Sequence, residues 1–176
     1  MAPDLENRTI LITGASSGIG RATAEGLART GARLLLQGRT PERCAEALAA
    51  VEAIAKGPVE LLQADLSSLA GIRRFAADVA SRADHLDVLI NNAGVTLPKR
   101  ALTEDGFEMT LAVNHHAYFL TTGLLLPLLG EERPSRIVNV ASDAHKFGRI
   151  DLDDLDNERR YSDLRVYGQS KTANML

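Results

Sequence analysis

The stretch TILITGASSGIGRATAEGLA, residues 9–28, joins a short apolar run to a helical pattern through a glycine-rich turn. Residues 9–13 are β-branched or apolar throughout, which is typical of a strand buried on both faces. From Ile19 to Arg29 the pattern becomes helical, rich in alanine and leucine, and Gly31 follows its end. A strand, a tight turn and a helix in this order predict the first unit of an α/β domain.

The same alternation of strand and helix continues along the chain. Apolar runs predict strands at 32–38, 59–66, 86–94 and 135–142. Helical patterns fill 40–56, with Gly57 just past the end, 68–82 and part of 103–129. Residues 151–163 are polar and loop-like, and a last helix begins near Leu164 and continues to the end of the chain. Five alternations predict right-handed crossovers and a doubly wound parallel sheet of the Rossmann-like kind. We expect residues 1–176 to form a single domain.

Composition narrows the class of protein. Apolar residues make up 45% of the 176, enough for a sizeable core. A net charge of -3 gives no electrostatic case for nucleic acid. The single cysteine, Cys44, rules out an internal disulfide and fits a reducing compartment. The polar start MAPDLENR is no signal peptide, and the apolar run GLLLPLLG is too short to span a bilayer. We expect a cytoplasmic protein without a membrane anchor.

The glycine-rich turn at residues 13–20 predicts a phosphate cradle. Glycine allows the positive φ and the close backbone approach that a bound pyrophosphate needs. The free N–H groups of the following helical turn then face the anion, aided by the helix dipole. The spacing is G-x3-G-x-G rather than G-x-G-x-x-G, but the physical requirement is the same. The cradle residues are Gly14, Ser16, Ser17, Gly18, Ile19 and Gly20.

The end of the second predicted strand indicates which dinucleotide is bound. An acidic residue there would bind the ribose 2′-hydroxyl of NAD, but the sequence reads Gln37-Gly38-Arg39. The planar fork of Arg39 could pair with a 2′-phosphate instead. We therefore favour NADP(H) over NAD(H) as the cofactor.

Several motifs together resemble the short-chain dehydrogenase/reductases over residues 8–176. They are TGASSGIG, NNAG at 91–94, Asn114, Ser142 and the Tyr167-x-x-x-Lys171 pair. DGFE, VNH, PSRIVNVAS and YGQSKTAN resemble the retinol-dehydrogenase-like branch. Relative to that family the chain is expected to be incomplete at its C-terminus, ending after the fifth strand and the start of the next helix.

The resemblance implies roles for single residues. Asp65 would lie near the adenine, and Asn91 with the backbone of Ala93 and Gly94 would line the adenosine ribose side and hold the central strand. Asn114 would shape the long helix and bind a water of a proton relay. The long helix and the Tyr167 helix would also form a homodimer or homotetramer interface. The expected cofactor-binding set is Gly14, Ser16, Ser17, Gly18, Ile19, Gly20, Arg39, Asp65, Leu66, Asn91, Ala93, Gly94, Tyr167 and Lys171.

The spacing of Tyr167 and Lys171 places both side chains on one helix face. A phenol, with a reference pKa of ~10, is a poor base near neutrality. A neighbouring ammonium favours the phenolate form, so Tyr167 could exchange a proton with a carbonyl or alcohol oxygen. Ser142 follows the fifth strand at its carboxyl end and could hydrogen-bond the same oxygen. The expected catalytic residues are Asn114, Ser142, Tyr167 and Lys171.

Other interpretations stay open at this point. The chain could bind NADP(H) without turnover. Residues 14–18 also match the G-x-S-x-G elbow of serine hydrolases, with Ser16 as nucleophile. DLDDLDNER lacks the glycine of a calcium loop, and the histidines have no metal-ligand spacing with Cys44. We expect no metal, and a small carbonyl or alcohol compound as the partner, of a kind that the sequence does not reveal.

Overall fold

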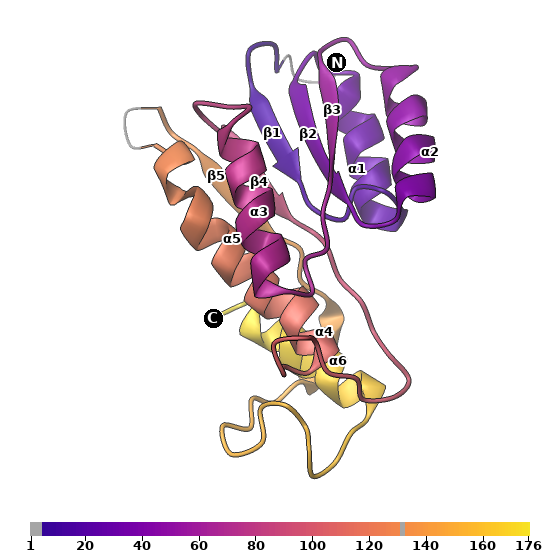
Figure 1. Cartoon of the computed structure of the whole chain (residues 1–176), viewed down its shortest axis with the longest axis vertical. Coiled ribbons are helices and arrows are strands. Elements are labelled where there is room, and N and C mark those ends of the chain that lie inside the picture. Colours follow the sequence, from indigo (N-terminus) through magenta and orange to yellow (C-terminus); the bar gives the residue numbers. More distant parts are fainter. Residues whose placement is uncertain (1–4, 131–132) are drawn as a thin grey trace.

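Five parallel strands form one sheet in the order β3-β2-β1-β4-β5 in the computed structural model of the chain, which describes residues 5–130 and 133–176 (Figure 1). Met1 to Asp4, the start of the polar N-terminal segment, lie outside the described residues. The strands are β1 (Thr9–Ile12), β2 (Arg33–Gly38), β3 (Val59–Gln63), β4 (Val88–Asn91) and β5 (Arg136–Asn139). The predicted doubly wound parallel sheet is confirmed.

The winding of the sheet reverses at β1. Leu11 of β1 pairs with Leu35 of β2 on one side and with Leu89 of β4 on the other. In open α/β sheets, ligands bind outside the carboxyl ends of the strands at such a reversal. The glycine-rich turn that follows β1 therefore lies where a dinucleotide is expected.

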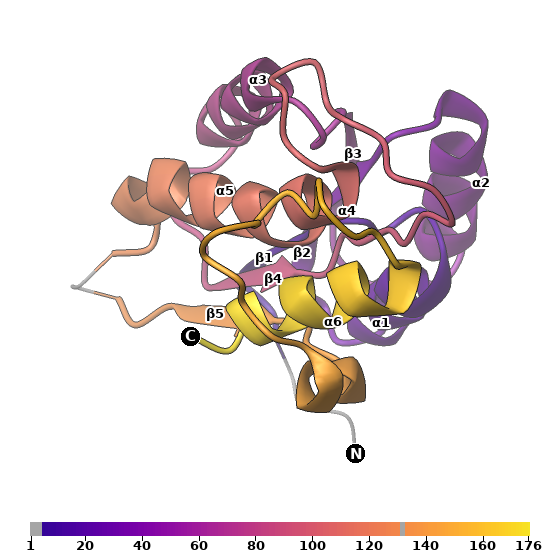
Figure 2. The same cartoon turned by 90° about the horizontal axis from the view of Figure 1, so that it is seen from below.

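Helices cover both faces of the sheet. They are α1 (Gly18–Ala28) and α2 (Pro41–Glu52) on one face, and α3 (Leu69–Ala80) and α5 (Ala117–Leu125) on the other. Figure 2 shows α3 and α5 on the opposite side of the strands from α1. Ile10 and Ile12 pack toward α1, whereas Leu11 packs toward α3 and α5, because successive strand side chains alternate. The continuous apolar runs of β1 and β2 thus correspond to strands buried on both faces, whereas all four residues of the edge strand β5 are exposed.

The helical segment between β4 and β5 is less regular than the sequence suggests. It consists of α4 (Met109–Leu111), a π-helical turn η1 (Ala112–His116), α5 and a 3₁₀ turn η2 (Leu126–Leu128). A second 3₁₀ turn, η3 (Asp143–Phe147), and α6 (Asp163–Ala173) follow β5. Figure 1 shows α4 and α6 beyond the carboxyl ends of the strands. Single π-helical turns occur often at functional sites, and η1 contains Asn114.

Some predicted boundaries are wrong by a few residues. Helix α2 ends at Glu52 rather than near Gly57, because the chain must turn before β3. The Lys56 amide donates to the Ala28 carbonyl, and a side chain at Gly57 would collide with the carbonyls of Gly31 and Ala32. Helix α6 ends at Ala173, with Asn174 as its C-cap, rather than at the last residue. No helix among the described residues is long and apolar enough to cross a membrane.

A charged cluster fastens the amino ends of β1 and β4. Asp87, only 5% exposed, accepts hydrogen bonds from Arg8 Nη1 at 2.7 Å and the Thr9 amide at 2.8 Å. Arg133 Nη2 lies 2.8 Å from the same carboxylate. Burial tends to raise the pKa of Asp87, but the Arg8 and Thr9 hydrogen bonds and the charges of Arg133 and Arg8 outweigh it and lower the pKa.

We predict that Asp87→Asn lowers the free energy of unfolding by about 1–3 kcal/mol at neutral pH, because charged hydrogen-bond partners are left uncompensated. Because the pKa of Asp87 is lower in the folded state, its carboxylate stabilises the folded protein at pH values above its unfolded-state pKa of ~3.9. This stabilisation is lost as the pH falls through the folded-state pKa. Urea unfolding at pH values above and below that point measures the difference. Asp143→Asn, which removes an exposed pair with Lys146, is the control and should change little. Equal stability of wild type and Asp87→Asn at neutral pH would contradict this account.

Candidate active site

The turn between β1 and α1 adopts a conformation that requires glycine. Gly14 and Gly18 have φ values of +66° and +54°. A Cβ on Gly14 would also lie 2.7 Å from the Cα of Ala93, so the turn packs directly on the segment after β4. Ser17 stands at the N-cap of α1, but its side chain makes no capping hydrogen bond. The first amides of the helix therefore remain open to an anion.

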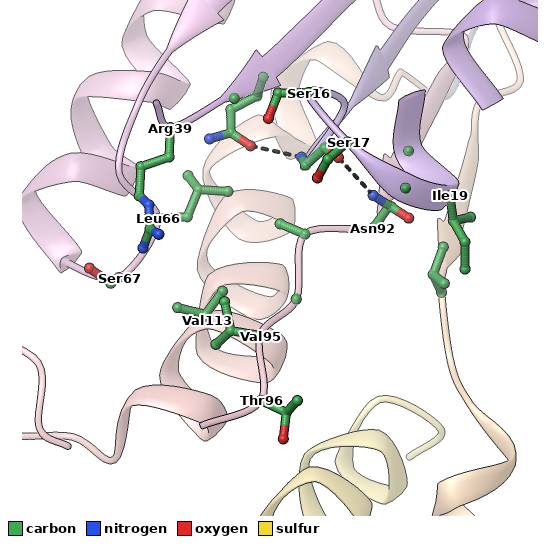
Figure 3. Close-up of a pocket in the computed structure, with 18 of the residues that line it drawn as sticks. Ser16, Ser17, Ile19, Arg39, Leu66, Ser67, Asn92, Val95, Thr96 and Val113 are labelled. Carbon is green, nitrogen blue, oxygen red and sulfur yellow. Dashed lines mark hydrogen bonds between the residues drawn. The ribbon is translucent and has the colours of Figure 1, made fainter. Parts of the chain in front are cut away.

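Polar side chains at the ends of three strands hold this turn in place. Gln37, buried in β2, accepts a hydrogen bond from the Gly14 amide at 2.8 Å and donates to the Ala64 carbonyl at 2.7 Å. Asn92, after β4, donates to the carbonyls of Thr13 at 2.9 Å and Gly14 at 3.2 Å. Figure 3 shows Asn92 pointing at the turn. The cradle is thus fastened to both neighbouring strands.

Thr13 completes the attachment to β4. Its hydroxyl accepts hydrogen bonds from the amides of Asn92 at 2.9 Å and Ala93 at 3.1 Å. Sequence analysis did not single out Thr13, Gln37 or Asn92 as site residues. The available signal was their position, since each is a polar residue at or just after the carboxyl end of a strand.

One cavity of about 540 Å³ extends from this turn in both directions. Toward β2 and β3 it is lined by Arg39, Thr40, Arg43, Asp65, Leu66 and Ser67. Figure 3 shows Arg39 extending beside Leu66 toward Ser67. Among the residues that the structure describes, no carboxylate pairs with Arg39 or Arg43. Both guanidinium groups are therefore available to an anionic ligand, and Arg43 is a residue that sequence analysis missed.

The other direction leads to Ser142, Tyr167 and Lys171, which line the same cavity together with Val95, Thr96 and Val140. The two ends of the predicted site, more than one hundred residues apart in sequence, thus share one space. The predicted residues that line it are Gly14, Ser16, Ser17, Gly18, Ile19, Gly20, Arg39, Asp65, Leu66, Ala93, Gly94, Ser142, Tyr167 and Lys171.

Asn91 does not line the cavity, contrary to the expected contact with the adenosine ribose. Its side chain is 1% exposed and donates to Thr122 Oγ1 at 3.0 Å and Asn139 Oδ1 at 2.9 Å. Because side chains alternate along an extended segment, Asn91 points toward α5 and β5 while Asn92 points toward the turn. The structure places Asn91 as a tie between β4 and its neighbours.

Asn114 also lies behind the cavity, fully buried in the π-helical turn. Its Oδ1 accepts from the Val95 amide at 2.7 Å, and its Nδ2 donates to the Val95 carbonyl at 2.9 Å and Ser170 Oγ at 3.0 Å. Its backbone carbonyl accepts from Asn174 Nδ2 at 2.8 Å. Asn114 therefore links the segment after β4 to α6, the helix that carries Tyr167.

Tyr167 and Lys171 lie one turn apart on α6 and face the cavity together. Lys171 is 3% exposed, and its Nζ donates to the Val140 carbonyl at 2.8 Å. The Nζ lies 5.8 Å from the centre of the Tyr167 ring. Burial lowers the pKa of Lys171. Ser142 caps η3 by accepting from the Ala144 amide at 3.2 Å, which fixes its side chain at the cavity wall.

Among the described residues, no group of three or more histidine, cysteine, aspartate or glutamate side chains is placed to hold a metal ion. Carboxylates of the acidic loop 151–163 accept hydrogen bonds from backbone amides, both within the loop and at Glu108. Asp154 accepts from the amides of Glu158 and Arg159, and Asp156 accepts from the Glu108 amide at 2.8 Å.

Known proteins resemble this chain in both sequence and fold. A family model described as short chain dehydrogenase matches residues 8–152. Human retinol dehydrogenase 14 is 44% identical over 98% of the chain, which covers 55% of that relative. A crystal structure from Mycobacterium paratuberculosis has a TM-score of 0.85 at 43% identity, covering 98% of this chain and 60% of that one. The NADP active-site complex of Pseudomonas aeruginosa RhlG has a TM-score of 0.77 at 33% identity, covering 98% and 66%.

The chain belongs to the short-chain dehydrogenase family, a family of oxidoreductases. Within it, the similarity is to the retinol dehydrogenases, so the predicted family and branch are confirmed. The chain spans about half the length of the curated relatives that it matches. Membership of this family leaves no reason to treat residues 14–18 as a hydrolase elbow.

The attachment of the turn can be tested by substitution. Gln37→Leu leaves the Gly14 amide and the Ala64 carbonyl without partners, and we predict a loss of about 1–3 kcal/mol in unfolding free energy. Gln63→Leu, which removes an exposed side chain on the adjacent strand, is the matched control and should cost little. Urea denaturation measures both. Equal stability of the two variants would show that the Gln37 contacts do not hold the turn.

Proposed function

We propose that the chain carries the site of an NADP(H)-dependent oxidoreductase, which transfers a hydride between nicotinamide and a carbonyl or alcohol carbon. The observation that carries this proposal is the single cavity that joins the glycine turn and two unpaired arginines to Ser142, Tyr167 and Lys171. Residues 1–176 would then act as one dinucleotide-binding domain. The family membership supports the reaction class.

The residues present fit a dinucleotide with a 2′-phosphate. The open amides at the start of α1 suit the diphosphate, and the side chain of Ser17 leaves them free. Arg39 and Arg43 line the end of the cavity beside β2, where a carboxylate would favour NAD. Solved relatives in complex with NADP or NADPH lend further support.

The chain's own residues supply the acid–base chemistry that hydride transfer requires. When bound, the nicotinamide gives or takes the hydride. Tyr167 gives a proton to the substrate oxygen during reduction and takes it back during oxidation. Ser142 donates a hydrogen bond to the same oxygen and stabilises its developing charge. The positive charge of Lys171 attracts the negative charge that develops on the Tyr167 oxygen as the proton leaves it. Asn114 holds α6 in place through Ser170.

The substrate class is inferred from the relatives, and the oligomeric state from exposed apolar side chains. The relatives named retinol dehydrogenases support an alcohol or the corresponding carbonyl compound as the substrate class. Phe119 and Leu126, on and just after α5, are 76% and 56% exposed. These apolar side chains support a homo-oligomer formed through the long helical segment, as the sequence led us to expect.

A second candidate function is binding of NADP(H) without turnover. NADPH fluorescence titration combined with a panel of aldehydes and ketones separates the two candidates. Binding with oxidation of NADPH supports the enzyme, whereas binding with no oxidation across the panel supports the binding module.

We predict that Arg39→Asp weakens NADPH binding by about 10- to 100-fold, because a charged hydrogen bond to the 2′-phosphate of ~1.5–3 kcal/mol is lost. NADH binding should stay equal or become tighter, because the new carboxylate can accept from the ribose hydroxyl. Arg73→Asp, at an exposed position on α3, is the control for charge alone. An unchanged NADPH affinity in Arg39→Asp would exclude this residue as the 2′-phosphate partner.

We predict that Tyr167→Phe lowers turnover by roughly 10²–10⁴-fold, the usual loss when a general acid or base is removed. NADPH affinity should change little, because the ring and Lys171 remain. Tyr161→Phe, which removes a phenolic hydroxyl that donates to the Leu97 carbonyl, is the matched control. Steady-state NADPH oxidation with a carbonyl compound that the wild-type chain reduces provides the measurement. Near-normal turnover would remove Tyr167 from the mechanism.

A further inference from the structure

Lys171 is a buried cation that no carboxylate neutralises within the described part of the chain. Its Nζ is hydrogen-bonded to the Val140 carbonyl, and no ion pair engages it. Removal from water disfavours the charged form of a lysine, and burial accordingly lowers the pKa of Lys171. The proposed role of this lysine nevertheless requires a positive charge, so some other interaction must stabilise it.

Two aromatic rings lie on the ammonium group. The Nζ of Lys171 is 5.8 Å from the ring centre of Tyr167 on the same helix and 5.5 Å from the ring centre of Tyr118 on α5. A cation within about 6 Å of an aromatic face is attracted by the ring quadrupole, and more strongly when water is excluded. Tyr118 is 4% exposed, so its ring approaches the ammonium in a dry environment.

The hydroxyl of Tyr118 adds a second, independent observation. It is buried and has no hydrogen-bond partner within the described residues. Burial, together with the charge of Tyr167, raises the pKa of Tyr118, so this phenol stays neutral while Tyr167 exchanges protons. Because this hydroxyl makes no hydrogen bond, it does not hold Tyr118 in place. The part of Tyr118 that interacts with Lys171 is therefore the face of its ring.

We propose that Tyr118 is a positioning residue of the active site, whose ring face keeps the Lys171 ammonium charged and directed at the cavity. This inference rests on the proposed function, because the charge matters through its effect on Tyr167. The groups that face Lys171 are the Val140 carbonyl after β5, Tyr167 on α6 and Tyr118 on α5. Neither helix brings an acidic side chain to it, so the Val140 carbonyl and the two rings provide its electrostatic support.

The test is a pH titration of Lys171 by NMR in the ¹³C-lysine-labelled chain, with the signal assigned through Lys171→Arg. Tyr118→Leu removes the ring, and we expect the ionisation midpoint of Lys171 to fall by about one pH unit. Tyr118→Phe keeps the ring and removes only the unbonded hydroxyl, so its midpoint should equal that of the wild type. If Tyr118→Leu does not fold, as judged by circular dichroism, Tyr118→Met fills the site without an aromatic face and is expected to show the same fall.

The proposal would be overturned if the ionisation midpoint of Lys171 in folded Tyr118→Leu or Tyr118→Met equalled that of the wild type. It would also be overturned if Tyr118→Phe shifted this midpoint as far as Tyr118→Leu does. The titration requires neither cofactor nor turnover. Its failure would therefore leave the proposed oxidoreductase function standing, whereas failure of that function would appear as absent NADPH binding with an unchanged Lys171 result.

Discussion

The constraint on which this structure depends is that the polar backbone after β1 must be satisfied where the sheet reverses its winding. The Gly14 amide and the carbonyls of Thr13 and Gly14 find their partners in the side chains of Gln37 and Asn92. With those partners supplied from β2 and from the segment after β4, the turn is held open and the first amides of α1 remain free. The amides that a diphosphate would contact are therefore positioned by hydrogen bonds within the chain itself.

At the other end of the cavity, the group that needs stabilisation is the buried ammonium of Lys171 rather than polar backbone. Lys171 has lost its water and meets a carbonyl and two rings in place of a carboxylate. A carboxylate would neutralise the ammonium and cancel its effect on a neighbouring phenol, whereas a carbonyl dipole and ring faces stabilise the charge without removing it. Asn114 keeps this arrangement in register, since one side chain joins the Val95 backbone to Ser170 on α6.

The sequence predicts those parts of the molecule whose signal is local. Apolar runs mark the five strands, glycines at positive φ mark the turn, and four-residue spacing places Tyr167 and Lys171 on one face. Contacts between segments that are distant in the sequence produce no recognisable pattern in it. Asn91 and Asn92 are identical in type, and only the direction of each side chain after β4 makes Asn92 the partner of the turn. The π-helical turn at Asn114 and the packing of Tyr118 on Lys171 likewise depend on how α5 meets α6.

The most direct test of the central claim is a crystal structure of this chain with NADP⁺. The account predicts the diphosphate on the first amides of α1, the 2′-phosphate beside Arg39, and the nicotinamide ring within contact distance of Tyr167. A dinucleotide bound outside the cavity, or lying in it with the nicotinamide turned away from Tyr167 and Lys171, would contradict the account.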